Sequence, residues 1–262
     1  MKWPSHLPRP IASQDTYRSP GKQGTSVLWS TLQLYPRLFC IVATASRRAK
    51  KGRYSSTDWS DSSMRTLLAL EASGCHVEME GLHHIGETAG PVVFVGNHMS
   101  TTETFFLPGI IDPIKPVTFV IKPSLMDYPI FGAVMRSCKP IVVSRDNPRQ
   151  DLVTVLEQGR ERLRRGISIV LFPQTTRVIE FSPEKFNSLG IKLAKSAGVP
   201  VIPFALKTDA WGNGRMIKEF GRIDPRLTVH FSFGAPVTVE GNGREAHEHI
   251  VRFIGEKFAS WV

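Results

Sequence analysis

His98 and Glu103 are the pair of side chains whose types and spacing best suit acid–base chemistry in this sequence. His98 follows the apolar run PVVFVG at residues 91–96, and Glu103 lies five residues later, at the start of an apolar stretch typical of a helix. A carboxylate in the first turn of a helix can accept the Nδ1 proton of the imidazole, which leaves Nε2 free to take a proton from a hydroxyl. Chance produces this spacing often, so a buried structural histidine is the alternative interpretation.

Polar side chains also follow two other apolar runs. Arg145 comes directly after PIVVS, and the residues Gln174, Thr175, Thr176 and Arg177 come directly after ISIVLFP. Ligands of open α/β sheets bind outside the carboxyl ends of the strands, where loops pass to helices. We therefore expect these side chains and His98 to converge at one edge of a sheet.

The elements that position these residues follow from an alternation of apolar runs and helical patterns. Strands are expected at 77–81, 91–96, 117–121, 141–144, 167–172, 199–206 and 227–233, and helices at 60–73, 103–111, 147–166, 182–198 and 244–261. This rhythm predicts an α/β fold, in which residues 58–262 form a single domain with a mostly parallel central sheet flanked by helices. The strand at 77–81 is expected at an edge of that sheet.

The positive charge of the chain is concentrated at its N-terminal end. The 262 residues carry a formal charge of +10, but residues 1–53 hold ten basic side chains and one acid, so the remainder is nearly neutral. This distribution argues against a nucleic-acid binder that uses its whole surface. Residues 1–26 contain four prolines and no hydrophobic periodicity, which predicts a disordered basic tail.

Residues 27–57 predict an amphipathic helix followed by a basic linker. The apolar window 27–46 is long enough to span a bilayer, but Gln33, Pro36 and Arg37 interrupt its middle, which argues against a spanning helix. Its aromatic residues and the five basic residues that follow favour a helix lying in the headgroup region of an anionic membrane. A helix packed on its own domain is the alternative.

Cysteine and histidine usage indicates no metal site. The three cysteines have no CxxC spacing and are odd in number, which argues against a disulfide framework or a structural zinc site and fits a reducing compartment. The pairs His83-His84 and His247/His249 have no cysteine or aspartate in ligand spacing, so we expect solvated or capping histidines.

Three blocks of the sequence resemble the glycerolipid acyltransferases of the lysophosphatidic acid acyltransferase type. NHMSTTE at 97–103 resembles the family's N-H-x-S-x-x-D block, FPQTTR at 172–177 resembles F-P-E-G-T-R, and VPVIP at 199–203 resembles V-P-V-I-P. The blocks occur in the family's order within residues 75–235. Two departures stand out: Glu103 replaces the usual aspartate, and Gln174-Thr175 replaces Glu-Gly, which removes a negative charge beside the substrate.

The resemblance implies transfer of a fatty acyl group from acyl-CoA or acyl-carrier protein to the hydroxyl of lysophosphatidic acid, a step of phospholipid biosynthesis. It implies no metal, no cofactor and no covalent acyl-enzyme. His98 is then the general base and Glu103 its orienting partner. The resemblance also implies that the substrate is bound by Lys122, Arg145, Gln174, Thr175, Thr176 and Arg177. Of these, the two arginines are expected to bind the acceptor phosphate. The alternative is a surface ion pair for each arginine and a loop cap for Thr176.

The expected partners are a lysophospholipid, an acyl thioester and an anionic membrane surface, with no nucleic acid. The expected location is the cytoplasmic face of a membrane. Gln174-Thr175 keeps open an acyltransferase for another lysophospholipid or an amino lipid. Glu103 and Gln174 together keep open a catalytically weakened, lipid-binding member of the family. A nucleic-acid-binding protein is supported by charge alone.

Overall fold

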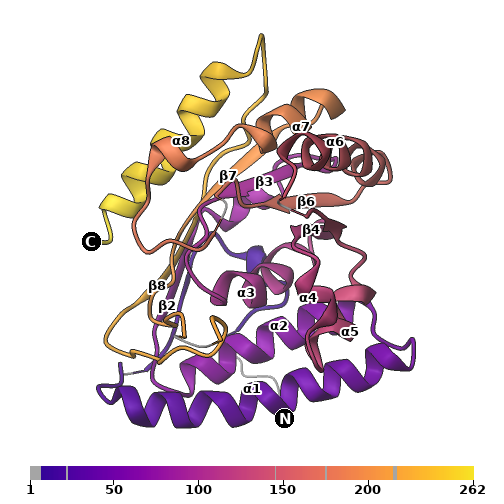
Figure 1. Ribbon diagram of the computed structural model, residues 1–262. Helices are drawn as coiled ribbons and strands as arrows, with labels where there is room; N and C mark the ends of the chain where they lie inside the picture. The colour runs from indigo at the N-terminus through magenta and orange to yellow at the C-terminus, as the bar shows by residue number, and fades with distance from the viewer. Residues whose placement is uncertain (1–6, 22, 145, 175, 215–216) are drawn as a thin grey trace.

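An eight-stranded sheet runs through the middle of the computed structural model, which describes residues 7–21, 23–144, 146–174, 176–214 and 217–262 (Figure 1). The strands lie in the order β1-β2-β8-β7-β3-β6-β4-β5. Their bounds are β1 Tyr17–Arg18, β2 Val77–Glu80, β3 Val93–Gly96, β4 Val117–Ile121, β5 Ile141–Val142, β6 Ser168–Leu171, β7 Val201–Lys207 and β8 Val229–Phe233.

The five strands from β7 to β5 are mutually parallel, as the sequence predicts. β3 pairs in parallel with both β7 and β6, and β4 pairs in parallel with β6 and β5. β8 runs antiparallel to β7, and β2 runs parallel to β8, so β2 points opposite to β3. The central strands are apolar throughout because both faces of a parallel sheet are covered. The carboxyl ends of β3, β4, β6 and β7 therefore meet at one edge.

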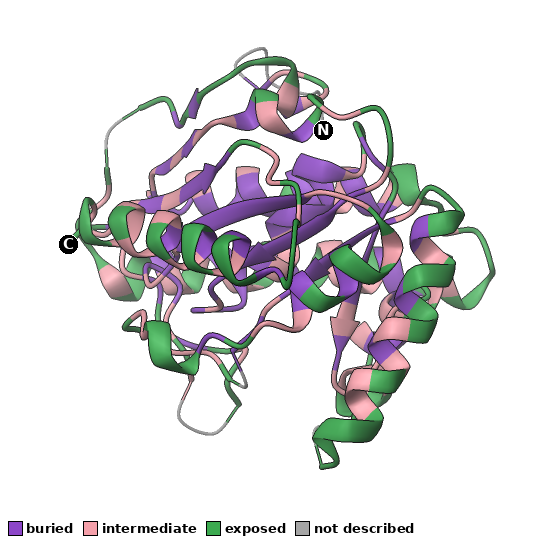
Figure 2. Cartoon of the chain, turned by 90° about the horizontal axis from the view of Figure 1, so that it is seen from above, coloured by how far each residue is buried: buried purple, intermediate pink, exposed green. Residues whose placement is uncertain are grey.

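Helices cover both faces of the sheet (Figures 1 and 2). The α-helices are α1 Val27–Lys50, α2 Ser56–Glu71, α3 Thr102–Ile111, α4 Ser124–Asp127, α5 Phe131–Ser137, α6 Pro148–Arg164, α7 Leu189–Ala197 and α8 Arg244–Ala259, and the 3₁₀ helices are η1 Ile11–Ser13, η2 Leu82–Ile85 and η3 Pro183–Lys185. One core lies between the sheet and α1–α5. A second core lies between the sheet and α6–α8.

α6 shows how local sequence sets an element's bounds. The side chain of Asn147 accepts hydrogen bonds from the backbone N–H groups of Arg149 and Gln150, both at 3.2 Å, and Pro148 occupies the first helical position. Gly166 follows the helix with a φ of 79°, a left-handed conformation that favours glycine. The predicted cap, first turn and end of this helix are confirmed.

The N-terminal segment differs from the disordered tail that the prolines predict for residues 1–26. Over residues 7–21 the chain packs on the body: Leu7, Ile11 and Tyr17 are buried in the first core. The hydroxyl of Ser19 donates to Glu71 at 2.6 Å, and Tyr17 also donates to that carboxylate. β1 pairs with β2, so β2 is an inner strand and the prediction of an edge strand is wrong.

The helix predicted over 182–198 is two separate elements, η3 and α7. Asn187 interrupts it, because its side-chain amide donates to the carbonyl oxygen of Pro173 and its side-chain oxygen accepts from the N–H of Leu189 at 2.9 Å. These contacts hold the chain against Pro173, shortly after the end of β6, and α7 begins as a separate helix after Asn187.

α1 packs on the domain through one face and leaves apolar side chains on another. Leu34, Leu38 and Ala45 are buried, and the helix contacts α2 and α5. On the opposite side four large apolar residues are exposed, namely Leu28 (71%), Trp29 (63%), Leu32 (58%) and Phe39 (61%). The packed-helix alternative is thus correct for one face. Among the described residues no helix combines the length and the apolar character needed to cross a bilayer.

Candidate active site

The loop between β3 and α3 carries His98 and is fastened at its base by Asn97. The Asn97 amide donates to the carbonyl oxygen of Leu206 at 2.8 Å, and its oxygen accepts from the N–H of Leu206 at 2.8 Å. Asn97 is buried, so both of these bonds are protected from water. The loop that follows β3 is therefore tied to β7 immediately before the histidine.

His98 and Glu103 meet in the way that their spacing predicts. Nδ1 of His98 lies 2.8 Å from Oε1 of Glu103. A carboxylate only accepts hydrogen bonds, so Nδ1 carries the proton in this contact. The glutamate, one methylene longer than aspartate, reaches the ring without loss of the hydrogen bond.

The Glu103 carboxylate is fully buried and surrounded by donors. Oε1 accepts from the backbone N–H groups of Met99 at 2.6 Å and Ser100 at 2.8 Å, and Oε2 accepts from the hydroxyl of Thr208 at 2.8 Å. Burial alone would raise the pKa of Glu103, but the hydrogen bond and charge of His98, together with the two N–H groups, hold it below its ordinary value. Glu103 is therefore ionised at neutral pH.

Three further contacts hold His98, one through its ring and two through its backbone. Its ring stacks on Phe172 with a centroid distance of 4.3 Å and an interplanar angle of 21°. Its backbone N–H donates to Oε1 of Gln174 at 2.7 Å, and its carbonyl oxygen accepts from the N–H of Val178 at 3.0 Å. The side chain is 13% exposed, and none of the residues described hydrogen-bonds to Nε2. Nε2 is the basic atom left open for a reactant.

The segment after β6 runs beside His98 and brings two buried donors to the site. Gln174 is 3% exposed, and its Nε2 has no partner in the part of the chain that the structure describes. Nη2 of Arg177 lies 3.4 Å from Oε1 of Glu219, whereas Nη1 is buried without a partner among those same residues. The ion-pair alternative thus holds for one nitrogen of Arg177. Thr176 is exposed, and its hydroxyl accepts from Lys218 at 3.4 Å.

The other predicted substrate-binding residues are less closely defined. Lys122 directly follows β4, whose carboxyl end lies at the same edge of the sheet as His98, and its side chain is partly buried. Arg145 and Thr175 lie outside the described residues. The structure therefore brings together His98, Glu103 and Gln174, places Arg177 next to Val178, whose backbone contacts His98, and places Lys122 at the same edge.

Comparison with known proteins now identifies the fold and its catalytic class. The family model described as acyltransferase matches residues 76–207. A 1-acyl-sn-glycerol-3-phosphate acyltransferase from Pseudomonas aeruginosa is 32% identical over 196 residues, which cover 74% of this chain and 70% of the relative. The chain belongs to the acyltransferase family. The resemblance carried by the three sequence blocks is confirmed, and the protein is an enzyme.

One further relative agrees with this assignment, and one solved structure shares the fold. A probable 1-acyl-sn-glycerol-3-phosphate acyltransferase from Mycoplasma pneumoniae is 31% identical over 118 residues, covering 44% of each chain. The crystal structure of the 1-acyl-sn-glycerophosphate (LPA) acyltransferase PlsC from Thermotoga maritima superimposes with a TM-score of 0.64 at 19% identity, covering 89% of this chain and 95% of that chain. The second likeness shows that the acyltransferase shares the α/β fold of that protein.

Two residues of the acyltransferase site were missed from the sequence. Thr208 follows β7 directly, so the strand-end position that singled out the other candidates also applies to it. Glu219 lies in the segment after β7 and has no such signal, although its carboxylate pairs with Arg177 and accepts from the hydroxyl of Tyr128 at 3.2 Å. Only the three-dimensional structure brings Glu219 to the site.

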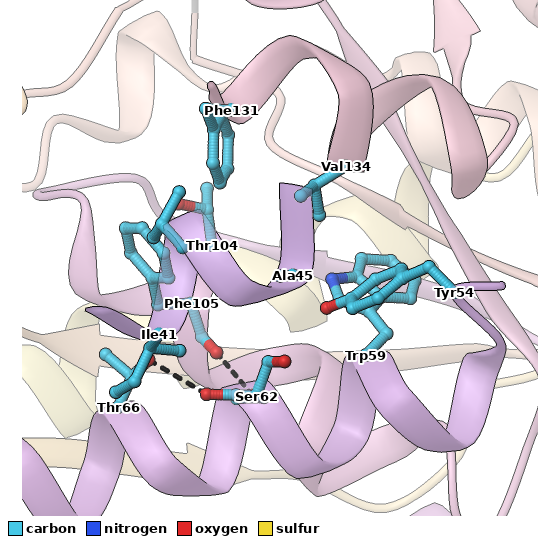
Figure 3. Close-up of a pocket in the computed structure, with 12 residues that line it drawn as sticks. Ile41, Ala45, Tyr54, Trp59, Ser62, Thr66, Thr104, Phe105, Phe131 and Val134 are labelled. Carbon is cyan, nitrogen blue, oxygen red and sulfur yellow. Dashed lines mark hydrogen bonds between the residues drawn. The ribbon is translucent and has the colours of Figure 1, made fainter. Parts of the chain in front are cut away.

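A mostly apolar pocket lies on the far side of α3 from the sheet, between α1, α2 and α5 (Figure 3). Thr104 and Phe105, the two residues after Glu103, line it together with Ile41 of α1 and Phe131 of α5. The helix that supplies the buried carboxylate therefore also forms a wall of a cavity shared with α1.

Both carboxylate oxygens of Glu103 already accept hydrogen bonds, so this residue is not free to bind a metal ion. The expected absence of a cofactor stays a prediction.

Proposed function

We propose that this acyltransferase moves a fatty acyl group from acyl-CoA or acyl-carrier protein to the free hydroxyl of lysophosphatidic acid. The observation that carries the proposal is the open Nε2 of His98, whose Nδ1 is held 2.8 Å from the buried, ionised Glu103. The choice of acceptor is supported by the relatives from Pseudomonas aeruginosa and Mycoplasma pneumoniae, which are named for 1-acyl-sn-glycerol-3-phosphate.

In this mechanism the acceptor oxygen attacks the thioester carbonyl carbon while Nε2 of His98 takes the hydroxyl proton. The new C–O bond forms, the C–S bond breaks, and the thiolate leaves with the proton that His98 gives up. Glu103 stays ionised and keeps the proton on Nδ1, so that Nε2 remains the base. A thioester is already activated, so the protein supplies mainly base catalysis and the alignment of two bound substrates. The reaction then needs no nucleophilic side chain.

We assign the acceptor phosphate to the side chains at the ends of β4 and β6. Arg177 offers Nη1, and Gln174 offers Nε2; each is a buried donor without a partner in the described chain, and such groups are costly unless a ligand satisfies them. Lys122 adds a positive charge at the same edge. Arg145, Thr175 and Thr176 complete the proposed set.

Two alternatives rest on the departures from the family blocks. Gln174-Thr175 in place of Glu-Gly changes the side chains beside the substrate, which keeps open another lysophospholipid or an amino lipid as the acceptor. A catalytically weakened lipid-binding protein is disfavoured, because the hydrogen bond between His98 and Glu103 has an ordinary length.

An acceptor panel tests the assignment of the phosphate. We expect wild-type enzyme to acylate lysophosphatidic acid with a higher kcat/KM than monoacylglycerol, lysophosphatidylcholine or a lyso-amino lipid, with acyl-CoA and acyl-carrier protein each tried as donor. Arg177→Gln should lower kcat/KM for lysophosphatidic acid by about 10-fold or more, since a charged hydrogen bond contributes about 1.5–3 kcal/mol. The KM of the donor should be unchanged.

Arg160→Gln on the exposed surface of α6 is the matched control and should behave as wild type. Preference for a different acceptor would replace lysophosphatidic acid in the proposal. An Arg177→Gln enzyme that retains its full preference for the phosphate-bearing acceptor would remove Arg177 from the phosphate site.

We also propose that the exposed apolar face of α1, defined as Leu28, Trp29, Leu32 and Phe39, lies on an anionic membrane surface. These residues are well exposed on a helix that is otherwise held against α2 and α5. Basic residues Arg47, Arg48 and Lys50 occupy its last turn. Apolar side chains that enter the headgroup boundary and basic groups that meet anionic lipid act together at such a surface. A lipid acceptor would then reach the enzyme from the membrane.

The double variant Trp29→Ser/Phe39→Ser is expected to bind vesicles of mixed phosphatidylcholine and phosphatidylglycerol about 10-fold more weakly or worse, measured by co-sedimentation. Replacing both side chains removes apolar surface that would be buried in the membrane, which weakens the binding free energy by at least about 1.4 kcal/mol. Val153→Ser, which removes an exposed apolar side chain from α6 on the other side of the sheet, should bind as wild type. Equal binding by both variants would place the membrane contact elsewhere.

A further inference from the structure

A cluster of His83, His84, Glu87 and Asp15 lies outside the active site, at η2 and the turn after it. Nε2 of His83 is 3.4 Å from Oε1 of Glu87, and Nδ1 of His84 is 2.9 Å from the same oxygen. One ligand-type atom from each of these three residues lies within 4.8 Å of the others. The structure thus supplies carboxylates next to the histidine pair that, in the sequence, has no aspartate or cysteine in ligand spacing.

Asp15 orients one of the two imidazoles. Its carboxylate contacts Nδ1 of His83, which leaves Nε2 of that ring directed to Glu87. A histidine that ligates a metal commonly donates its other ring N–H to a carboxylate in this way, which fixes its tautomer and raises its basicity. Asp15 comes from the N-terminal segment, 68 residues away in the sequence, so no local pattern reveals this contact.

His84 provides a second and independent indication. Its Nδ1 is buried and has no hydrogen-bond partner among the described residues, although the Glu87 oxygen is only 2.9 Å away. The contact has the distance but not the direction of a hydrogen bond. A buried ring nitrogen left in this state is costly, and an ion placed between the nitrogen and the carboxylate would satisfy both groups.

The backbone holds these side chains in place before any ion binds. Gly81 turns the chain from β2 into η2 with a φ of 66°, and a Cβ at this position would meet the carbonyl oxygen of Phe233 at 2.1 Å. The N–H of Glu87 bonds to the carbonyl oxygen of His84 at 3.4 Å, and Lys115 donates to the carbonyl oxygen of Gly90 at 2.7 Å. The turn that carries Glu87 is therefore fixed at both ends.

We propose that Nε2 of His83, Nδ1 of His84 and the carboxylate of Glu87 bind one divalent transition-metal ion of the zinc class, with Asp15 holding His83. Bonds of about 2.0–2.1 Å in a tetrahedral site place ligand atoms about 3.4 Å apart, and the two imidazole nitrogens lie 3.4 and 2.9 Å from the Glu87 oxygen. Two imidazoles and one carboxylate suit zinc, cobalt or nickel better than magnesium or calcium, which take oxygen ligands. With neutral imidazoles, the carboxylates of Glu87 and Asp15 balance the charge of a divalent ion.

The site lies at the opposite edge of the sheet from His98, because β2 runs antiparallel to β3 and η2 follows the carboxyl end of β2. It joins the N-terminal segment to the body: the N–H of Leu82 already donates to the carbonyl oxygen of Asp15 at 3.0 Å. The ion strengthens this junction and takes no part in acyl transfer.

The test is calorimetric titration of zinc into the full chain, prepared without a histidine tag, together with His84→Ala and Asp15→Asn. Wild type should bind one zinc ion per chain, and excess magnesium should not compete. His84→Ala should lose this binding. Asp15→Asn should retain the stoichiometry with an affinity about 10- to 100-fold lower, the usual cost of losing a residue that orients a ligand. The double variant His247→Ala/His249→Ala on α8 removes two histidines elsewhere and should bind as wild type.

Hydrogen exchange supplies a second readout. Zinc should slow exchange of the amides in residues 7–18 of wild type and leave those of His84→Ala unchanged, while acyl transfer stays the same in both. Absence of zinc binding by wild type would overturn the proposal. The proposal would also be overturned if the α8 double variant lost zinc binding to the same extent as His84→Ala. Unchanged affinity in Asp15→Asn would overturn the arrangement in which Asp15 orients His83.

Discussion

His98→Ala is expected to lower kcat for acyl transfer by about 10²- to 10⁴-fold, the usual contribution of a positioned general base. Alanine removes Nε2, which is the open basic atom of the site, and leaves the acceptor hydroxyl without a group to take its proton. The side chains that we propose bind the phosphate, at the ends of β4 and β6, remain, so KM for the acceptor should change little. Initial rates with saturating acyl thioester and varied lysophosphatidic acid separate the two constants.

His247→Ala is the matched control for His98→Ala, because it removes a partly buried imidazole from α8, on the other face of the sheet. Its kcat should equal that of wild type. Thermal unfolding of both variants distinguishes lost chemistry from lost structure. A folded His98→Ala enzyme that keeps the wild-type kcat would exclude His98 as the base.

Glu103→Gln is expected to lower kcat by about 10²- to 10⁴-fold through the orientation of His98. The amide has no charge to hold the proton on Nδ1. Its NH2 group can face the hydroxyls of Ser100 and Thr208, which can accept as well as donate, so the variant loses the charge and keeps hydrogen-bond partners. Glu103→Asp keeps the charge and matches the residue usual in the family's block, so it should retain much more activity than Glu103→Gln.

The stability of the same variant should depend on pH in a defined direction. The pKa of Glu103 is held below its ordinary value of 4.5 in the folded protein, so the unfolded chain binds the proton more readily. The ionised carboxylate of Glu103 therefore stabilises the fold above pH 4.5. This stabilisation is lost as the pH falls through the lower pKa that Glu103 has in the folded protein. The difference in unfolding free energy between wild type and Glu103→Gln should shrink below pH 4.5 in denaturant titrations.

If the difference instead grows on acidification, the carboxyl group is protonated in the folded state and Glu103 does not hold His98 by charge. If Glu103→Gln is as active as Glu103→Asp, hydrogen-bond geometry alone orients the imidazole. Either result would separate the structural role of the buried acid from its proposed role in positioning the base.

Local patterns predicted the parallel part of the fold and the contact of His98 with Glu103. Apolar runs bounded by turns identified β3, β6 and β7, and the cap at Asn147 identified the start of α6, because each signal lies within a few residues of the element that it defines. The contact between His98 and Glu103 spans only five residues, so strand-then-helix geometry was sufficient to predict it.

Contacts between distant segments could not be predicted in this way. The N-terminal segment is ordered by the pairing of Tyr17 with Met79 and by bonds to Glu71, partners more than fifty residues away. Glu219 reaches Arg177 from the segment after β7, and Asp15 reaches His83 from before α1. Asp15, Tyr17 and Glu219 lie in no periodic pattern of the sequence, so their contacts depend on tertiary packing that no local signal reveals.

The most direct test of the central claim is a coupled count of free thiol and acylated lipid with purified enzyme, acyl-CoA and lysophosphatidic acid. The proposed mechanism predicts one free thiol for each phosphatidic acid formed, no thiol release when the acceptor is omitted, and loss of both products with His98→Ala. Thiol release at the same rate without acceptor, or no acylated lipid at any acceptor concentration, would contradict it.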